Sequence, residues 1–253
     1  MLPKLAVIFP GLGYGPDRPL LYYAGKLAAG AGYELVRADY GQLPRVDRPS
    51  GGRVDEAGLE ECIRLALEHA ASQLDGFLDG KAGGEGGSLL FISKSIGTAV
   101  GAAYAALRNL HPRQLLYTPV RKTFLHPLGD SVAFHGTCDP WLGNKDCEDL
   151  CRAASVPLHT FEGANHSLEC GDVLRDIGFL SEAMRITEAF IKGLPSSEPV
   201  QAGRGDASSS AASRVQFGRN WRTLQGREDA EMLREKTAGW SSSRGGYGDE
   251  DYN

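Results

Sequence analysis

Three residues of the sequence have side chains that together could carry out nucleophilic catalysis: a serine, an aspartate and a histidine. Ser95 lies in "FISKSIG", Asp139 in "HGTCDPW" and His166 in "GANHSLE". A serine hydroxyl is a weak nucleophile until a neighbouring imidazole accepts its proton, and a carboxylate can hold that imidazole in the required tautomer. This chemistry needs all three side chains in one place, so the surrounding elements must bring them together.

The segment around Ser95 has the pattern of a sharp turn between a strand and a helix. The apolar run 88–93 precedes it, and the small, helix-compatible residues of 96–110 follow. A nucleophile elbow of this kind needs small residues two positions before and after the serine, because the chain passes close to its neighbours there. Ser93 and Gly97 are small enough, although glycine is the usual residue at the first of these positions. The alternative is a helix N-terminus capped by serine.

Strand-like and helical segments alternate along the first 194 residues. We expect strands at 4–10, 33–40, 88–93, 114–120, 131–137 and 157–163, and helices at 17–31, 54–78, 96–110, 144–155 and 173–194. This alternation predicts an α/β fold, a mostly parallel sheet flanked by helices on both faces. Ligands of such sheets bind beyond the carboxyl ends of the strands. Ser95, Asp139 and His166 each follow an expected strand, so they should meet at that edge.

The chain order serine, aspartate, histidine is the order that the α/β-hydrolase arrangement uses. With "PGLGYG", "SKSIG", "HGTCDPW" and "GANHSL", the chain resembles the α/β-hydrolase superfamily, in particular its small, lidless bacterial members, over about residues 3–194. The resemblance implies that Ser95 is the nucleophile, His166 the general base and Asp139 the carboxylate that orients it. It also implies an open site, because the loop 121–130 is too short for a cap domain.

A hydrolase of this kind needs backbone donors for the oxyanion that forms at the carbonyl, each commonly worth about 3 kcal/mol. The N–H of Ile96 is one expected donor, and Leu12, with Gly13 as the alternative, is the other. The expected substrate pocket consists of Tyr14, Phe124, Leu128 and Trp141, whose alternative role is core packing. The predicted reaction is hydrolysis of small acyl esters or thioesters through an acyl-enzyme, with no metal and no organic cofactor. Lactone hydrolysis and acyl transfer would use the same residues.

Two other functions compete with this one. The loop "VIFPGLGYGPD" follows a strand and precedes a helix, as in a dinucleotide-binding fold. However, Pro16 stands where that motif needs glycine, and Asp39 comes later than the usual acidic residue. The second is a non-catalytic binding module of the same fold, which would be recognised by the loss of a triad residue.

Composition and charge limit the partners. The chain has 253 residues, 42% of them hydrophobic, and a formal net charge of −5. This charge argues against binding to nucleic acid or to an anionic membrane surface, so the expected partner is a small-molecule acyl substrate. Five cysteines, an odd number, and an N-terminus without a signal-peptide pattern lead us to expect reduced thiols and a cytoplasmic location. Cys147 and Cys151 lack a partner motif for a metal site.

The composition changes after residue 194. Segment 195–253 is rich in Ser, Gly and Ala, and it could hold one short helix near 226–237. Such a composition buries too little apolar surface to offset the entropy of ordering. We therefore expect a hydrolase domain at 1–194 and a largely disordered tail at 195–253. Docking of a protein partner through Trp221 and Trp240 is a further interpretation of the tail.

Overall fold

A computed structural model of the chain describes residues 4–47, 54–78 and 88–194. These residues form a six-stranded, fully parallel sheet with the strand order β2-β1-β3-β4-β5-β6. Its strands are β1 (Lys4–Phe9), β2 (Glu34–Arg37), β3 (Ser88–Lys94), β4 (Arg113–Tyr117), β5 (Ser131–Gly136) and β6 (Leu158–Phe161). The predicted tail and the helix suggested near 226–237 lie outside the described residues.

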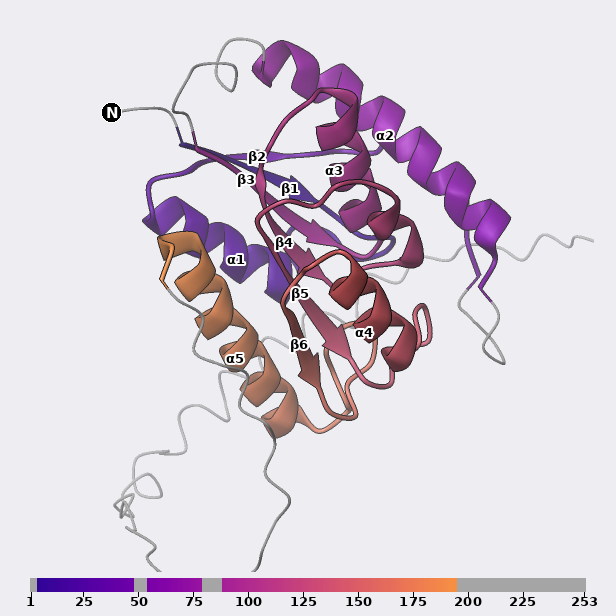
Figure 1. Cartoon of the computed structure of the whole chain (residues 1–253), viewed down its shortest axis with the longest axis vertical. Helices are drawn as coiled ribbons and strands as arrows, with labels where there is room; N and C mark the ends of the chain where they lie inside the picture. Colours follow the sequence, from indigo (N-terminus) through magenta and orange to yellow (C-terminus); the bar gives the residue numbers. More distant parts are fainter. Residues whose placement is uncertain (1–3, 48–53, 79–87, 195–253) are drawn as a thin grey trace, which may run out of the picture. The chain divides into compact units, whose positions relative to one another are not determined.

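Helices cover both faces of the sheet (Figure 1). Those of one face are α1 (Pro19–Gly30) and α5 (Val173–Lys192); those of the other are α2 (Glu56–Leu78), α3 (Ile96–Leu107) and α4 (Asn144–Ala153), with a short 3₁₀ turn, η1, at Arg121–Leu125. The expected fold class, an α/β sheet flanked on both faces, is therefore confirmed. No helix in the described ranges is long and apolar enough to cross a membrane.

The alternation of side chains along β1 explains how one strand serves two cores. Ala6 and Ile8 pack with α1 and α5, whereas Leu5, Val7 and Phe9 pack with α2 and α3. Successive side chains of a strand point to opposite faces, so a strand that is covered on both sides must be apolar throughout. This is why "LAVIF" is a continuous apolar run.

The helix ends follow the expected local signals. Pro19 begins α1, where a missing N–H costs nothing. Asp172 caps α5 by accepting hydrogen bonds from the N–H groups of Leu174 and Arg175, and Gly193 ends it with φ +66°. Several strands are shorter than expected at their carboxyl ends, because the chain leaves the sheet there to form the loops of the candidate site.

Candidate active site

The sheet order brings the three candidate residues to one edge. Ser95 follows β3, Asp139 follows β5 and His166 follows β6, and β4 lies between β3 and β5. All six strands are parallel, so all of their carboxyl ends lie at the same edge. Residues far apart in the chain therefore become neighbours.

Ser95 sits on a strained turn. Its φ and ψ are +56° and −124°, a conformation that residues other than glycine rarely adopt. Its N–H donates to the Tyr117 carbonyl oxygen at 3.0 Å, which ties the turn to the end of β4. Outliers of this kind persist where the surroundings fix them and are common at functional sites.

Two glycines allow the chain to pass close to this turn. A Cβ atom at Gly97 would lie 2.2 Å from the Phe9 carbonyl oxygen, and a Cβ at Gly11 would lie 2.9 Å from the Ser95 Cβ. Both distances are too short for any side chain, so β1 and its loop are packed directly against the elbow. Ser93, the other small residue of the pattern, is fully buried.

The three side chains form a continuous hydrogen-bond relay. His166 Nε2 lies 2.7 Å from Ser95 Oγ, and His166 Nδ1 lies 2.7 Å from Asp139 Oδ2. The second carboxylate oxygen, Oδ1, accepts the Trp141 N–H at 2.9 Å. The Asp139 side chain is fully buried and that of His166 is 18% exposed, so the relay is closed at the carboxylate and accessible at the imidazole.

Burial keeps His166 in the form that can accept a proton. Desolvation, with the nearby positive charge of Lys94, lowers the pKa of His166 to about 4, although the Asp139 carboxylate opposes this. Burial disfavours the charged imidazolium, and the carboxylate favours it. At neutral pH the His166 imidazole is therefore unprotonated. A second histidine, the fully buried His135, also approaches the carboxylate, with its Nδ1 3.7 Å from Asp139 Oδ2.

The loop after β1 lies against the turn that carries Ser95. Gly11 and Tyr14 exchange two backbone hydrogen bonds, of 3.0 and 3.2 Å, which close a tight turn with Gly13 at φ +64°. The N–H groups of Leu12 and Gly13 take no part in this pair. Ile96 is the first residue of α3, and the first amides of a helix have no acceptor within it. These three are the amides that the sequence suggested for an oxyanion.

A cavity of about 500 Å³ opens over Ser95, and we call it the Ser95 cavity. Its lining includes Leu12, Gly13, Tyr14, Lys94, Trp141 and Ser167, together with 44–46 from the loop after β2. The Trp141 ring stands 5.6 Å from the His166 ring, centroid to centroid. The contribution of 44–46 was not predicted, because nothing in "LPRVD" distinguishes it from an ordinary loop.

Phe124 and Leu128, which the sequence suggested for the pocket, do not line the Ser95 cavity. Leu128 is buried with Leu116, Ala133 and Leu142 on the α4 side of the sheet, and Phe124 packs against the same cluster. The 3₁₀ turn η1 directs this loop towards α3 and α4 instead of across the mouth of the site. Phe124 and Leu128 therefore belong to the core, which was the alternative role expected for them.

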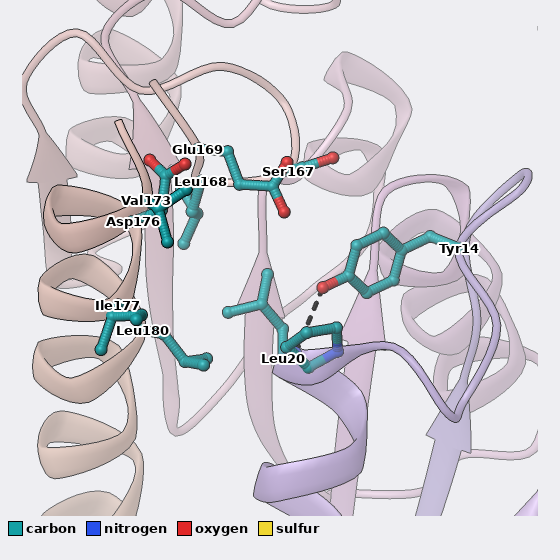
Figure 2. Close-up of a pocket in the computed structure, with 10 residues that line it drawn as sticks. Tyr14, Leu20, Ser167, Leu168, Glu169, Val173, Asp176, Ile177 and Leu180 are labelled. Carbon is teal, nitrogen blue, oxygen red and sulfur yellow. Dashed lines mark hydrogen bonds between the residues drawn. The ribbon is translucent and has the colours of Figure 1, made fainter. Parts of the chain in front are cut away.

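Tyr14 lies between the Ser95 cavity and a second hollow of about 210 Å³ between α1 and α5, which we call the α1–α5 cavity. Figure 2 shows the residues that line this second hollow. The Tyr14 hydroxyl accepts the Leu20 N–H at 3.1 Å, which fixes the ring between the two cavities. Apolar side chains from both helices face the hollow, among them Leu20, Ile177 and Leu180. Tyr14 and Ser167 line both cavities.

The described part of the chain contains no group of three or more His, Cys, Asp or Glu side chains that could hold a metal ion. Cys147 and Cys151 are buried one turn apart in α4, within an apolar cluster.

Comparisons with known proteins agree with this architecture. No model of a known protein family matches the sequence, and no curated protein sequence matches it. Among solved structures, a protein from Xanthomonas campestris pv. campestris assigned to the alpha/beta superfamily of hydrolases is similar, with a TM-score of 0.54 and 19% identity over 76% of this chain and 99% of that one. A protein of unknown function from Agrobacterium tumefaciens, described as an alpha/beta hydrolase candidate, has a TM-score of 0.54 and 20% identity over 78% of this chain and 89% of that one.

A third similar structure is an alpha-beta serine hydrolase homologue from Coxiella burnetii, with a TM-score of 0.51 and 14% identity over 72% of this chain and 84% of that one. Together with the parallel sheet, these similarities show that the chain has the α/β-hydrolase fold. The resemblance inferred from the sequence motifs is therefore confirmed for the fold, and the chemistry must be argued from the site itself.

Proposed function

We propose that the protein is a serine hydrolase that cleaves small acyl esters or thioesters through an acyl-enzyme on Ser95. The observation that carries the proposal is the hydrogen-bond relay from Ser95 Oγ through His166 to Asp139, with both contacts at 2.7 Å. A nucleophile, a base and an orienting carboxylate in this arrangement are what acyl transfer requires.

In the first half of the proposed reaction, Ser95 Oγ attacks the carbonyl carbon while its proton passes to His166 Nε2. The carbonyl electrons move to oxygen, and the amides of Ile96 and of Leu12 or Gly13 donate hydrogen bonds to the oxyanion. The oxyanion then collapses, and the bond to the leaving group breaks. The leaving oxygen or sulfur takes the proton from His166 and departs as an alcohol or thiol.

In the second half, water replaces the leaving group. His166 accepts a proton from the water as its oxygen attacks the acyl carbon, and it returns a proton to Ser95 Oγ when the acyl bond breaks. The products are a carboxylic acid and the free enzyme. No step consumes an oxidant, a reductant or a cofactor.

The α1–α5 cavity supports an acyl substrate with an aliphatic chain. It adjoins the Ser95 cavity at Tyr14 and Ser167, and apolar side chains line most of it. A chain that extends from an acyl group on Ser95 past Tyr14 would leave water for an apolar wall, which is favourable by about 0.8 kcal/mol per buried methylene.

The test is labelling by a fluorophosphonate probe, which reacts with activated serine hydroxyls. We expect the wild-type protein to be labelled and Ser95→Ala to lose the label without loss of secondary structure. Ser72→Ala removes an exposed serine on α2, outside both cavities, and should keep the label, so it is the matched control. A folded wild-type protein that takes no label would contradict the proposal, and nucleotide binding at "PGLGYG" would be tested next.

A further inference from the structure

Lys94, the residue before the candidate nucleophile, has its ammonium buried beneath the site. The residue is 1% exposed. Its Nζ donates to Thr118 Oγ1 at 2.5 Å and to the His166 carbonyl oxygen at 2.7 Å, and both acceptors are neutral oxygens. The Tyr14 ring lies on another side, with its centroid 5.0 Å from Nζ.

Packing alone does not explain a lysine at this position. Removing an ammonium from water is costly, and without a paired carboxylate the cost is only partly offset. The same desolvation disfavours the charged form of Lys94 and lowers its pKa to about 7. An apolar side chain of similar length would fill the same space at a lower cost. The contacts of Nζ therefore need a reason of their own.

The two acceptors lie on segments whose positions relative to Ser95 matter for the proposed catalysis. Thr118 follows β4 and holds an unusual backbone conformation, with φ +44°. The other acceptor is the main-chain carbonyl of His166, the candidate base, in the loop after β6. Lys94 itself is the last residue of β3, next to Ser95. One ammonium thus joins the strand of the nucleophile, the neighbouring strand and the backbone of the base.

We propose that Lys94 is a positioning residue for His166, whose ammonium ties the backbone of the base to the strand that carries the nucleophile. The catalytic consequence rests on the proposed serine hydrolase function. The tie itself does not, because it is a property of the folded protein. Small displacements of a catalytic group can cost about 100-fold in rate, so a fixed backbone at His166 has a clear use.

The charge of Lys94 can be followed through the pKa of His166. A residue with a purely structural role would leave that pKa unchanged when it is replaced. The groups that act on the His166 imidazole are Lys94 from β3, Asp139 from the loop after β5 and His135 from β5. Those that act on Lys94 are Asp139 and Glu169, both carboxylates. The Lys94 cation lowers the pKa of His166, whereas Asp139 raises it. Removing the cation should therefore raise the pKa of His166.

The experiment compares Lys94→Met with Thr118→Val in the full chain. Lys94→Met removes the ammonium and keeps the length of the side chain. Thr118→Val removes one acceptor and keeps the charge. For each variant, the pKa of the His166 ring is followed by NMR titration, kcat and KM are measured with a short-chain ester, and thermal unfolding reports the stability.

For Lys94→Met we expect the His166 pKa to rise and kcat to fall between about 10-fold and 100-fold, with little change in KM and no fall in Tm. For Thr118→Val we expect a smaller fall in kcat and a His166 pKa equal to that of the wild type. Because the NMR titration needs no turnover, it separates the two proposals. A raised His166 pKa in a protein that fluorophosphonate does not label would leave the tie intact and overturn the hydrolase proposal.

Two results would overturn the role of Lys94. One is a folded Lys94→Met protein with the wild-type kcat, whether or not its His166 titration changes. The other is a fall in kcat that follows a fall in Tm with no change in the titration, since that is the behaviour of a purely structural residue. If Lys94→Met does not fold, Thr118→Val decides: an unchanged kcat in that variant would show that the ammonium contacts do not position the base.

Discussion

The two cavities on either side of Tyr14 differ in what they present to a ligand. The Ser95 cavity is lined by the hydrogen-bonded side chains of Ser95 and His166 and by Leu12 and Gly13 of the β1 loop. The α1–α5 cavity is smaller, and the apolar side chains of its two helices face it (Figure 2). Under the proposed function, we expect the first cavity to carry out the chemistry and the second to select the substrate.

The two cavities differ because one lies at the ends of the strands and the other lies between two helices. Backbone and polar side chains gather where strands become loops, because loops carry the groups that the sheet cannot use. Helix faces next to the sheet are apolar because they must bury a stripe against it. Where the N-terminal part of α5 extends past that stripe, Val173 and Ile177 stay 70% and 58% exposed. An apolar surface beside a reactive edge is well suited to an acyl chain.

The largest expected effect tests the reactive side of this comparison. Asp139→Asn should lower kcat by about 10⁴-fold, because the amide oxygen would stay with the Trp141 N–H and the NH2 group would face His166 Nδ1, donate to it and hold the ring in the wrong tautomer. The comparison is made by steady-state kinetics with a short-chain ester. Asp146→Asn is the matched control, since Asp146 pairs with Arg121 at the surface. Equal rates for wild type and Asp139→Asn would show that the carboxylate is misassigned.

The pH dependence of the same reaction comes next. The pKa of His166 is lowered to about 4, so the imidazole stays neutral down to that pH. We expect kcat/KM to be level as pH falls from 7 towards 5, and then to drop about tenfold per pH unit below pH 4 as His166 is protonated. Circular dichroism at each pH distinguishes this fall in kcat/KM from acid unfolding of the protein. A limb near pH 6.5 in the folded protein would contradict the buried environment of His166.

The same shift has a consequence for stability. The pKa of His166 is lower in the folded state than the ordinary value of 6.5, so the unfolded state binds more protons between pH 6.5 and 4. The contribution of this residue therefore weakens the folded state as pH falls through that window, and it has no further effect on stability as pH rises above 6.5.

The smallest expected effect tests whether the α1–α5 cavity selects the acyl chain. Ile177→Trp would fill part of the α1–α5 cavity from an exposed position on α5. We expect the ratio of kcat/KM for octanoyl over acetyl esters to fall about tenfold, a change that two or three lost methylene contacts can produce. Leu194→Trp adds the same side chain at another exposed position and is the control. A ratio that does not change would place the acyl chain elsewhere.

Much of the fold could be predicted because its signals are local. The apolar run 4–10 reads as a strand buried on both sides, and Ser93 and Gly97 mark a close crossing whatever lies across from them. The order of Ser95, Asp139 and His166 along strand ends was also enough to predict that they meet, and the structure places them in hydrogen-bond contact. Their catalytic roles stay predictions until the variants are measured.

The sequence by itself determined the fold class and the edge of the sheet at which the candidate residues meet, because periodicity and turn chemistry depend on near neighbours along the chain. Only the tertiary structure decided which side chains face that edge. It turned Phe124 and Leu128 into the core, brought 44–46 to the cavity and buried the Lys94 ammonium against His166. These positions depend on contacts between residues as far apart as Lys94 and His166, and no local pattern encodes the direction of a side chain across such a distance.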